Sequence, residues 1–248
     1  MISKRHVFRF IILRTIGNFL VLFSLFGVAQ TFGPAIYIEI VYRTNLARNI
    51  QYIVAFPTPT PSKLVQAVPT SVPVPTVSRQ STFFGNLTGG NKVEALSPVS
   101  SQFGIVIPKI NANAPILPNI DAGNPDLYLP ALQNGVAHAA GTVFPGVSGN
   151  IYLFAHSTDA FWNVGRYNAI FYLIKELENG DEIDLFFNGV RHIYRVVNKL
   201  VVDPTEVRFL TEPTPYEQLV LQTCWPPGTT LKRLLVFARP ERDLLRQN

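Results

Sequence analysis

Residues 219–233 of this 248-residue chain read LVLQTCWPPGTTLKR. An apolar run from Leu219 leads directly into Cys224, the only cysteine in the sequence. A Pro-Pro-Gly turn follows, and a second apolar run opens on Arg233. Two strands joined by this turn would place a thiol and a fixed positive charge at adjacent strand ends. That arrangement suits covalent catalysis by a thiolate.

The single cysteine cannot form an internal disulfide bond, so its thiol is either inert and buried or free and reactive. A lone buried cysteine is more often a small core residue. The flanking Thr223, the turn and Arg233 favour the reactive alternative here. A thiol with a pKa of about 8.5 is only slightly ionised at neutral pH, so a base, a cation or a desolvated cleft has to help it.

A histidine that can act as this base follows another apolar run, in GNIYLFAHS at residues 149–157. Four apolar residues precede His156, which predicts a strand that delivers the imidazole to the rim of a sheet. There it would protonate the amine leaving group of a peptide bond and later take a proton from an incoming amine. Arg233 would stabilise the oxyanion of the tetrahedral intermediate or hold the substrate backbone. The alternatives are an ordinary polar strand end for His156 and a solvated charge for Arg233.

Five blocks of sequence, in order, resemble the sortase family, the cysteine transpeptidases of Gram-positive-type cell surfaces. They are residues 128–132, 135–146, 149–157 and 173–183, and Thr223-Cys224 with the downstream Arg233. The resemblance covers roughly residues 101–240, and Ala155 stands where the family usually has glycine. It implies Cys224, His156 and Arg233 as the catalytic set.

The resemblance also implies an activity: cleavage of a Leu-Pro-x-Thr-Gly-like sorting signal on another exported protein. Cys224 would attack the threonine carbonyl and form a thioester, which an amine from a cell-wall precursor or a pilin lysine would resolve. The alternative among enzymes is a thiol peptidase or hydrolase of the same fold, in which water resolves the thioester. The alternative outside enzymes is a barrel that only binds a surface partner, and the intact catalytic set argues against it.

Further substrate contacts are expected around the catalytic set. The resemblance places Thr223 beside the nucleophile and implies a structural or substrate-side role for His138. Residues 203–218 connect two expected strands and contain one apolar pair, Phe209 and Leu210. In sortases this connection lines the groove for the sorting signal, so both residues are candidate substrate contacts. The alternative is a plain surface loop.

No sequence pattern indicates a cofactor, a metal or a nucleic acid. One cysteine and scattered histidines lack the paired spacing of zinc sites, and no glycine-rich phosphate loop occurs. Some sortases use calcium, but the acidic residues form no ordered loop that would bind it. Residues 1–100 hold nine Lys and Arg against two acids, and residues 101–248 hold twelve against fourteen. The net charge of +5 therefore belongs to the N-terminal part, and no basic groove for phosphates is expected.

The N-terminal part predicts a single-pass membrane protein. Residues 1–14 form a basic tail, and residues 15–38 form an apolar run. As a helix this run would span roughly 36 Å, enough for a hydrocarbon core of about 30 Å. The basic tail predicts a cytoplasmic N-terminus and an extracytoplasmic C-terminal part. A cleaved signal peptide, with the cleavage site at residues 27–29, is the alternative.

The rest of the chain divides into two parts. Residues 39–100 are expected to form a juxtamembrane segment and a stalk rich in proline, serine and threonine, because such sequences favour extended conformations. Residues 101–248 have the usual size of one domain and form the expected extracytoplasmic catalytic domain. Short apolar runs separated by turns predict a mainly β fold, a closed or nearly closed barrel of seven or eight strands with one or two short helices.

The expected strands of this barrel cover residues 105–107, 116–117, 150–155, 182–187, 191–197, 219–224 and 231–238. Pro118 is expected to end the second of them. Asn188-Gly189 predicts a hairpin, because this pair readily adopts the positive φ angles of a type I′ turn. Residues 171–177 are the best expected helix.

Overall fold

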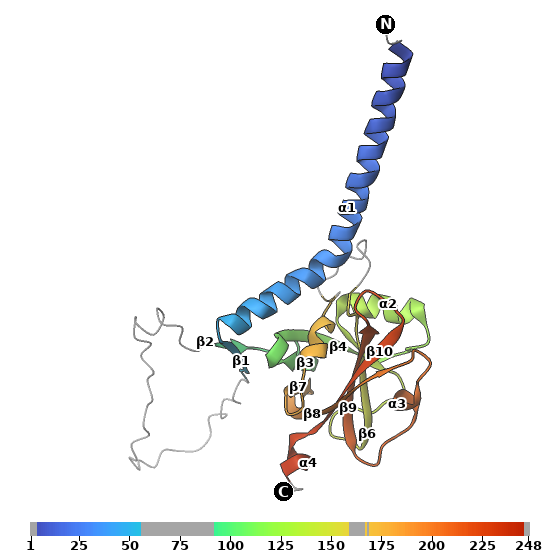
Figure 1. The fold of residues 1–248 in the computed structure, drawn as a ribbon. Helices are drawn as coiled ribbons and strands as arrows, with labels where there is room; N and C mark the ends of the chain where they lie inside the picture. Colours follow the sequence, from blue (N-terminus) through green and yellow to red (C-terminus); the bar gives the residue numbers. More distant parts are fainter. Residues whose placement is uncertain (1–3, 56–91, 159–166, 168, 246–248) are drawn as a thin grey trace, which may run out of the picture.

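A computed structural model describes residues 4–55, 92–158, 167 and 169–245 (Figure 1). Helix α1 (Lys4–Ala47) leads into a two-stranded parallel sheet of β1 (Ile50–Val54) and β2 (Lys92–Leu96), and a closed β-barrel follows. The mainly β, barrel-shaped fold expected from the sequence is confirmed. Most of the expected proline-rich stalk, residues 56–91, lies outside the described residues.

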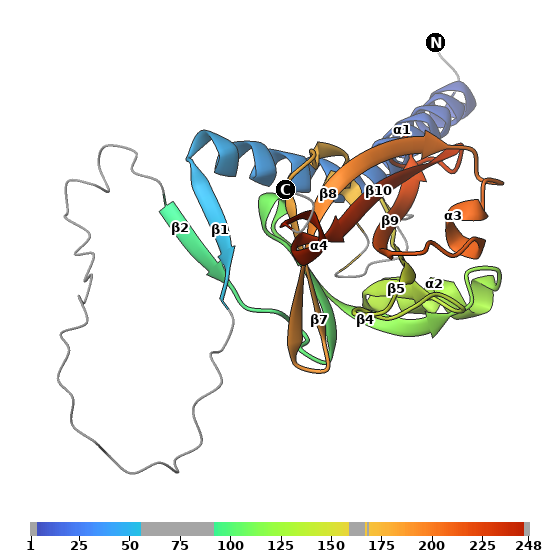
Figure 2. The same cartoon turned by 90° about the horizontal axis from the view of Figure 1, so that it is seen from below.

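The barrel has eight strands in the order β10-β8-β7-β3-β4-β5-β6-β9, and β9 pairs with β10 to close it (Figure 2). Its strands are β3 (Phe103–Ile107), β4 (Ala112–Ile120), β5 (Val136–Ala139), β6 (Gly149–Phe154), β7 (Glu182–Phe187), β8 (Val190–Val202), β9 (Glu217–Trp225) and β10 (Lys232–Pro240). Its short helices are η1 (Pro108–Ile110), α2 (Pro125–Asn134), η2 (Tyr172–Glu176), α3 (Arg208–Thr211) and α4 (Glu241–Leu245). The pairs β4–β5 and β6–β9 are parallel.

Aliphatic side chains of the strands form the core, and consecutive residues are buried along β3, β6 and β10. Ile151 and Leu153 of β6, Leu219 and Leu221 of β9 and Val236 of β10 are all fully buried. Burying one such side chain stabilises a fold by about 1.5–3 kcal/mol, so this layer holds the three strands together. The same strands carry the candidate catalytic residues on their other face.

The predicted hairpin between β7 and β8 is confirmed. Asn188 and Gly189 have φ angles of 49° and 76°, which are the left-handed values that a tight hairpin turn needs. β7 has the predicted bounds, and β8 continues to Val202, five residues beyond its expected end. The extra residues of β8 pair with β10, so this long strand connects the hairpin to the closing wall of the barrel.

The expectation that Pro118 ends a short strand is wrong, because β4 extends through it to Ile120. Pro118 lies where the register between β4 and β5 shifts, between Leu117 and Ile120. A proline cannot donate to a sheet ladder, and at this irregular position the missing N–H interrupts little. Tertiary pairing therefore overrides the local signal.

Two helical segments differ from the expectations. Within the helix predicted at residues 171–177, only Tyr172–Glu176 is helical, as the 3-10 helix η2. α2 covers the matched block at residues 128–132, to which no secondary structure had been assigned. α2 begins at Pro125, and the side chain of Asn124 accepts a hydrogen bond of 3.0 Å from the backbone N–H of Asp126. This is an ordinary N-terminal cap.

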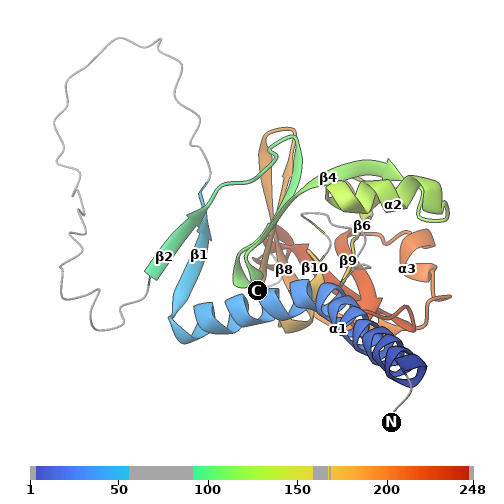
Figure 3. The same ribbon diagram turned by 90° about the horizontal axis from the view of Figure 1, so that it is seen from above.

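Helix α1 combines a candidate membrane span with a segment that contacts the barrel. Phe8–Ala29 is the one stretch of the described helices that is long and apolar enough to cross a membrane by length and composition, and it overlaps the expected span at residues 15–38. Beyond it α1 continues across one end of the barrel (Figure 3), where Ile38 and Tyr42 pack against the core. The juxtamembrane segment is therefore not separated from the catalytic part.

Candidate active site

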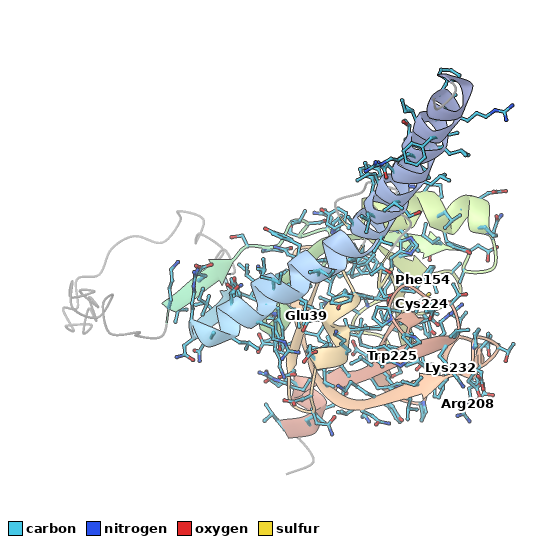
Figure 4. All side chains as sticks on the ribbon, turned by 45° about the horizontal axis from the view of Figure 1, so that its top comes forward. Glu39, Phe154, Arg208, Cys224, Trp225 and Lys232 are labelled. Atoms are coloured by element: carbon cyan, nitrogen blue, oxygen red, sulfur yellow. The ribbon has the colours of Figure 1, made fainter. Side chains whose placement is uncertain are left out.

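The pairing of β6, β9 and β10 brings the three candidate catalytic residues to one end of one wall. Arg233 of β10 lies directly opposite Cys224 of β9. Phe154 of β6 lies opposite Gln222 of β9 in the parallel pair, so His156, two residues farther on, reaches the level of Cys224. Figure 4 shows Phe154 and Cys224 side by side at this end of the barrel.

Cys224 and Arg233 also share one face of the wall. Side chains alternate along a strand, and directly paired residues point to the same side. Cys224 and Gln222 therefore lie on one face of β9 with Arg233 and Phe154, and His156 follows two residues beyond Phe154, past the end of β6. The Tyr152 hydroxyl of β6 donates a 2.6 Å hydrogen bond to Oε1 of Gln222, which places Tyr152 on this face too. We call it the groove face.

Thr223 lies on the opposite, interior face and links the ends of two strands. It is buried, and its Oγ1 donates a 2.9 Å hydrogen bond to the carbonyl oxygen of Ala155. The backbone N–H of Ala155 donates to the carbonyl oxygen of Gln222 at 3.2 Å, and the N–H of Phe171 donates to the carbonyl oxygen of His156 at 3.2 Å. These three bonds hold the segment that carries His156 beyond the end of β6. The position of Thr223 suits this link and leaves no surface for a substrate contact.

His138 is fully buried inside the barrel, away from the groove face. Its Nδ1 accepts a 3.3 Å hydrogen bond from the backbone N–H of Asn119, and its Nε2 is 3.1 Å from the carbonyl oxygen of Val143. Its ring stacks on Phe144 and meets the edge of Phe103. Burial lowers the pKa of His138, and the neutral ring with its proton on Nε2 satisfies both contacts. Of the two roles implied for His138, the structural one fits this position.

Arg233 carries a positive charge that no described carboxylate neutralises. Its Nη1 donates to the carbonyl oxygens of Thr230 and Lys232, both at 3.1 Å, which holds the guanidinium near the turn between β9 and β10. The neighbouring Lys232 is paired with Asp203 at 2.8 Å instead. Within the described part of the chain, the charge of Arg233 is therefore available to an anion that forms beside Cys224.

Tyr152 and Gln222 form a polar pair that had not been singled out from the sequence. Burial raises the pKa of Tyr152, so the phenol stays protonated and donates to Gln222. With its oxygen occupied in this way, the Gln222 amide can offer its N–H groups to a peptide in the groove. The sequence offers a signal for both residues. Side chains two or four positions apart along a strand lie on the same face, and Gln222 precedes Cys224 by two residues while Tyr152 precedes His156 by four.

A cavity of about 560 Å³ lies farther along the groove face, toward the start of β6 and β9. Asn150, Gln218 and Phe237 line it from the strands, and Phe209 lines it from α3. The Asn150 amide donates to the carbonyl oxygens of Phe209 and Glu212 at 3.1 and 2.8 Å, which ties the connection between β8 and β9 to the wall.

The two apolar residues expected to contact substrate are placed differently. The Phe209 ring contacts the Phe237 ring edge-on, with 5.1 Å between centroids, and borders the cavity. Leu210 packs against the core and is not among the residues that line the cavity. As for metals, the described residues contain no group of three or more His, Cys, Asp or Glu side chains placed to hold an ion.

The barrel part of the chain matches proteins of known family. The Sortase domain family matches residues 105–241, which is more than half of the chain. Sortase D of Bacillus subtilis (strain 168) is 29% identical over 153 residues, covering 60% of this chain and 69% of that protein. Among solved structures, sortase C-1 from Actinomyces oris is 29% identical, with a TM-score of 0.48, and the match covers 57% of this chain and 75% of that one. A lid mutant of sortase A from Corynebacterium diphtheriae is 28% identical, with a TM-score of 0.47, and the match covers 57% and 70%.

Proposed function

This chain belongs to the sortase family of transpeptidases, and we propose that Cys224 is its nucleophile, His156 its general acid and base, and Arg233 its oxyanion partner. The observation that carries this proposal is the strand register. Cys224 and Arg233 are cross-strand neighbours, and the parallel pairing of β6 with β9 leads the chain to His156 at the same end of the wall. Separate elements of the chain thus converge on one place with complementary chemistry.

The proposed reaction begins with attack of the Cys224 thiolate on the carbonyl carbon of the scissile peptide bond. The oxyanion that forms lies beside Arg233, whose charge stabilises it. His156 then donates a proton to the leaving amine, the C–N bond breaks, and a thioester to Cys224 remains. An incoming amine gives a proton to His156 and attacks the thioester carbonyl, which releases the thiolate and forms the new amide.

The proposed donor is an exported protein with a Leu-Pro-x-Thr-Gly-like sorting signal. The groove face supports an extended peptide through the partly exposed amide of Gln222, which lies on the same face of β9 as Cys224. Val220, Leu235 and Phe237 on this face are buried and stiffen the wall beneath it. The cavity of about 560 Å³ at the far end combines the rings of Phe209 and Phe237 with polar side chains such as Asn150 and Gln218. The proposed acceptor is an amine of a cell-wall precursor or of a pilin lysine.

The proposed location is the cell membrane, with a cytoplasmic N-terminus and an extracytoplasmic catalytic domain. The 22 residues of Phe8–Ala29 would span about 33 Å as a helix, which matches a bilayer hydrocarbon core. The acceptors and the exported donor proposed above both occur outside the cytoplasm, so this orientation brings the enzyme to its substrates.

The test uses the full chain in detergent or nanodiscs with a panel of sorting-signal peptides, with and without a small amine acceptor. Transpeptidation predicts a product in which the acceptor replaces the C-terminal part of the peptide, and Cys224→Ala should give none. Cleavage to a free carboxylate alone, at a rate that the acceptor does not change, would identify a hydrolase instead. Peptide binding without any cleavage would identify a binding barrel.

A further inference from the structure

The part of α1 that follows the candidate span has two different sides. On one side Ile38 and Tyr42 pack against the barrel, and Tyr42 is only 7% exposed. On the other side Ile36 and Ile40 are 56% and 57% exposed, and Tyr37, which is 69% exposed, lies at the border between the two sides, where it also lines a cavity toward the barrel. Three large apolar side chains on one short stretch of helix form a surface that water covers poorly.

Polar contacts hold this segment on the barrel. Nζ of Lys175 is 3.2 Å from Oε2 of Glu39, and Nη2 of Arg43 is 3.3 Å from Oε1 of Glu176. Both barrel partners belong to η2, next to the site where Tyr42 is buried. Each exposed ion pair is weak alone, but together with a buried tyrosine they define one orientation of the helix.

This orientation places α1 at the catalytic end of the barrel. η1 follows the end of β3 and η2 precedes the start of β7, and α1 lies against these two short helices. The antiparallel pairs link neighbouring strand ends around the barrel. The end of β3 lies beside the start of β7, the start of β7 leads to the end of β8, and the end of β8 lies beside the start of β10 and the end of β9. Figure 1 agrees, since α4 and the C-terminus lie at the opposite end from α1.

An exposed leucine lies at this end beside the catalytic set. Leu231 is 68% exposed in the turn between β9 and β10, two residues before Arg233. Helix α1 and this turn therefore both lie at the end of the barrel that carries Cys224.

We propose that these two apolar surfaces contact the membrane, so that α1 holds the catalytic end of the barrel against the lipid surface. The partner is the boundary between lipid headgroups and acyl chains. Ile36 follows the end of the span at Ala29 by seven residues, about 10 Å along a helix, so the exposed side begins where the membrane ends. Apolar residues and tyrosine on one side of a helix are typical of that boundary.

This inference rests on the membrane anchoring proposed above and deepens it. A barrel on a free stalk would sample many heights and orientations above the membrane. A barrel docked on α1 keeps Cys224 at the level of the lipid headgroups. The donors and acceptors that it meets are then those that are themselves held in the membrane.

The test measures the depth of single nitroxide labels in the full chain, reconstituted in nanodiscs of phosphatidylcholine and phosphatidylglycerol. Cys224→Ala removes the only native thiol, and single cysteines are introduced by Leu231→Cys, Tyr37→Cys or Val190→Cys. Val190 is the matched control, because it is 54% exposed in the hairpin at the opposite end of the barrel. Paramagnetic resonance then compares collisions with oxygen, which is enriched in lipid, and with a water-soluble nickel chelate.

Labels at positions 231 and 37 should collide more often with oxygen than with the nickel chelate, and the label at position 190 should do the reverse. Glu39→Lys, which places a like charge against Lys175 and Arg43, should move the label at position 231 toward water and leave the label at position 37 in lipid. Glu94→Lys in β2 is the control charge reversal and should move neither label.

Two results would overturn the proposal: a label at position 231 as water-accessible as the one at position 190, or no response of position 231 to Glu39→Lys. The label depths test only the membrane contact. The proposed reaction is tested separately, on the chain that keeps Cys224. Acyl transfer with a water-exposed position 231 would contradict only the membrane contact. A lipid-exposed position 231 in a chain without acyl transfer would contradict only the reaction.

Discussion

The two faces of the wall formed by β6, β9 and β10 differ in whether their polar side chains are already bonded within the protein. On the interior face, the hydroxyl of Thr223 hydrogen-bonds to the protein, as do both ring nitrogens of His138 on the adjacent strand β5, and both side chains are buried. Cys224 on the groove face and His156 beyond the end of β6 are partly exposed, and the charge of Arg233 has no carboxylate partner among the described residues. Residue type alone therefore does not distinguish a structural side chain from a reactive one. The position of the side chain in the barrel does distinguish them.

The largest expected effect separates the two histidines. His156→Gln should lower the rate of acyl transfer about 10²–10⁴-fold, because the leaving amine loses its proton donor. His138→Gln should lower the stability of the barrel and leave the rate per folded molecule within a few-fold of the original. Steady-state rates, corrected for the folded fraction by circular dichroism, make the comparison. Loss of turnover in a folded His138→Gln variant alone would reverse the assignment.

The second-largest effect on catalysis is expected from substitution of Arg233. Arg233→Ala should lower kcat/KM about 10²–10³-fold, as loss of one oxyanion donor does in other enzymes. Arg233→Lys should recover only part, since an ammonium is a compact point charge and cannot reproduce the planar donor set of a guanidinium. Lys232→Ala is the neighbouring control and should change kcat/KM little, because Lys232 is paired with Asp203. Equal losses for the two alanine variants would show that only net charge matters.

Thr223 tests the link across the interior face. Thr223→Val keeps the shape of the side chain but leaves the carbonyl oxygen of Ala155 without its 2.9 Å partner, which should cost about 1–3 kcal/mol of unfolding free energy. Thr229→Val, in the exposed turn, removes a comparable bond to the carbonyl oxygen of Pro226 and should cost much less. Denaturant titration measures both. Equal costs would mean that the Thr223 bond does not organise the strand ends.

The smallest expected effect is a pH dependence of stability from His138. Burial holds its pKa below 6.5 in the folded state, so its contribution to stability is present above pH 6.5 and is lost as pH falls below that value. One such group changes the unfolding free energy by at most about 1.4 kcal/mol per pH unit. His138→Gln should remove this part of the slope between pH 6.5 and 5. An unchanged slope would place a charged imidazole in the folded core.

Among the described residues, His192 and Asp184 also contribute to the change of stability with pH, and their contributions cancel in this comparison. Burial also lowers the pKa of His192, which acts in the same direction as His138. Burial raises the pKa of Asp184 to about 6, so its contribution falls as pH rises from about 4 to about 6 and opposes the histidines. Comparing His138→Gln with the unchanged chain at each pH isolates the His138 part.

Much of the barrel could be predicted from the sequence, because β7, its hairpin turn and β9 follow local rules of alternation and turn chemistry. The length of β4 could not, since Pro118 signals a break and only pairing with β5 shows that the strand continues. The contact of Tyr42 with the barrel could not either, because an apolar helix that continues a membrane span looks the same whether or not it docks. The apolar runs that lead to Cys224 and His156 are visible in the sequence, but the pairing of β6 with β9 that brings them to the same end of the wall depends on the register.

The central claim is that Cys224 forms an acyl-enzyme on the groove face, and peptide mass spectrometry of the trapped enzyme tests it most directly. The full chain is incubated with a sorting-signal peptide without an amine acceptor, quenched in acid and digested. The predicted result is one added acyl group, equal in mass to the peptide up to its threonine, located on Cys224 and released by added amine. Peptide cleavage that persists in Cys224→Ala, or an acyl group found on any other residue, would contradict the account.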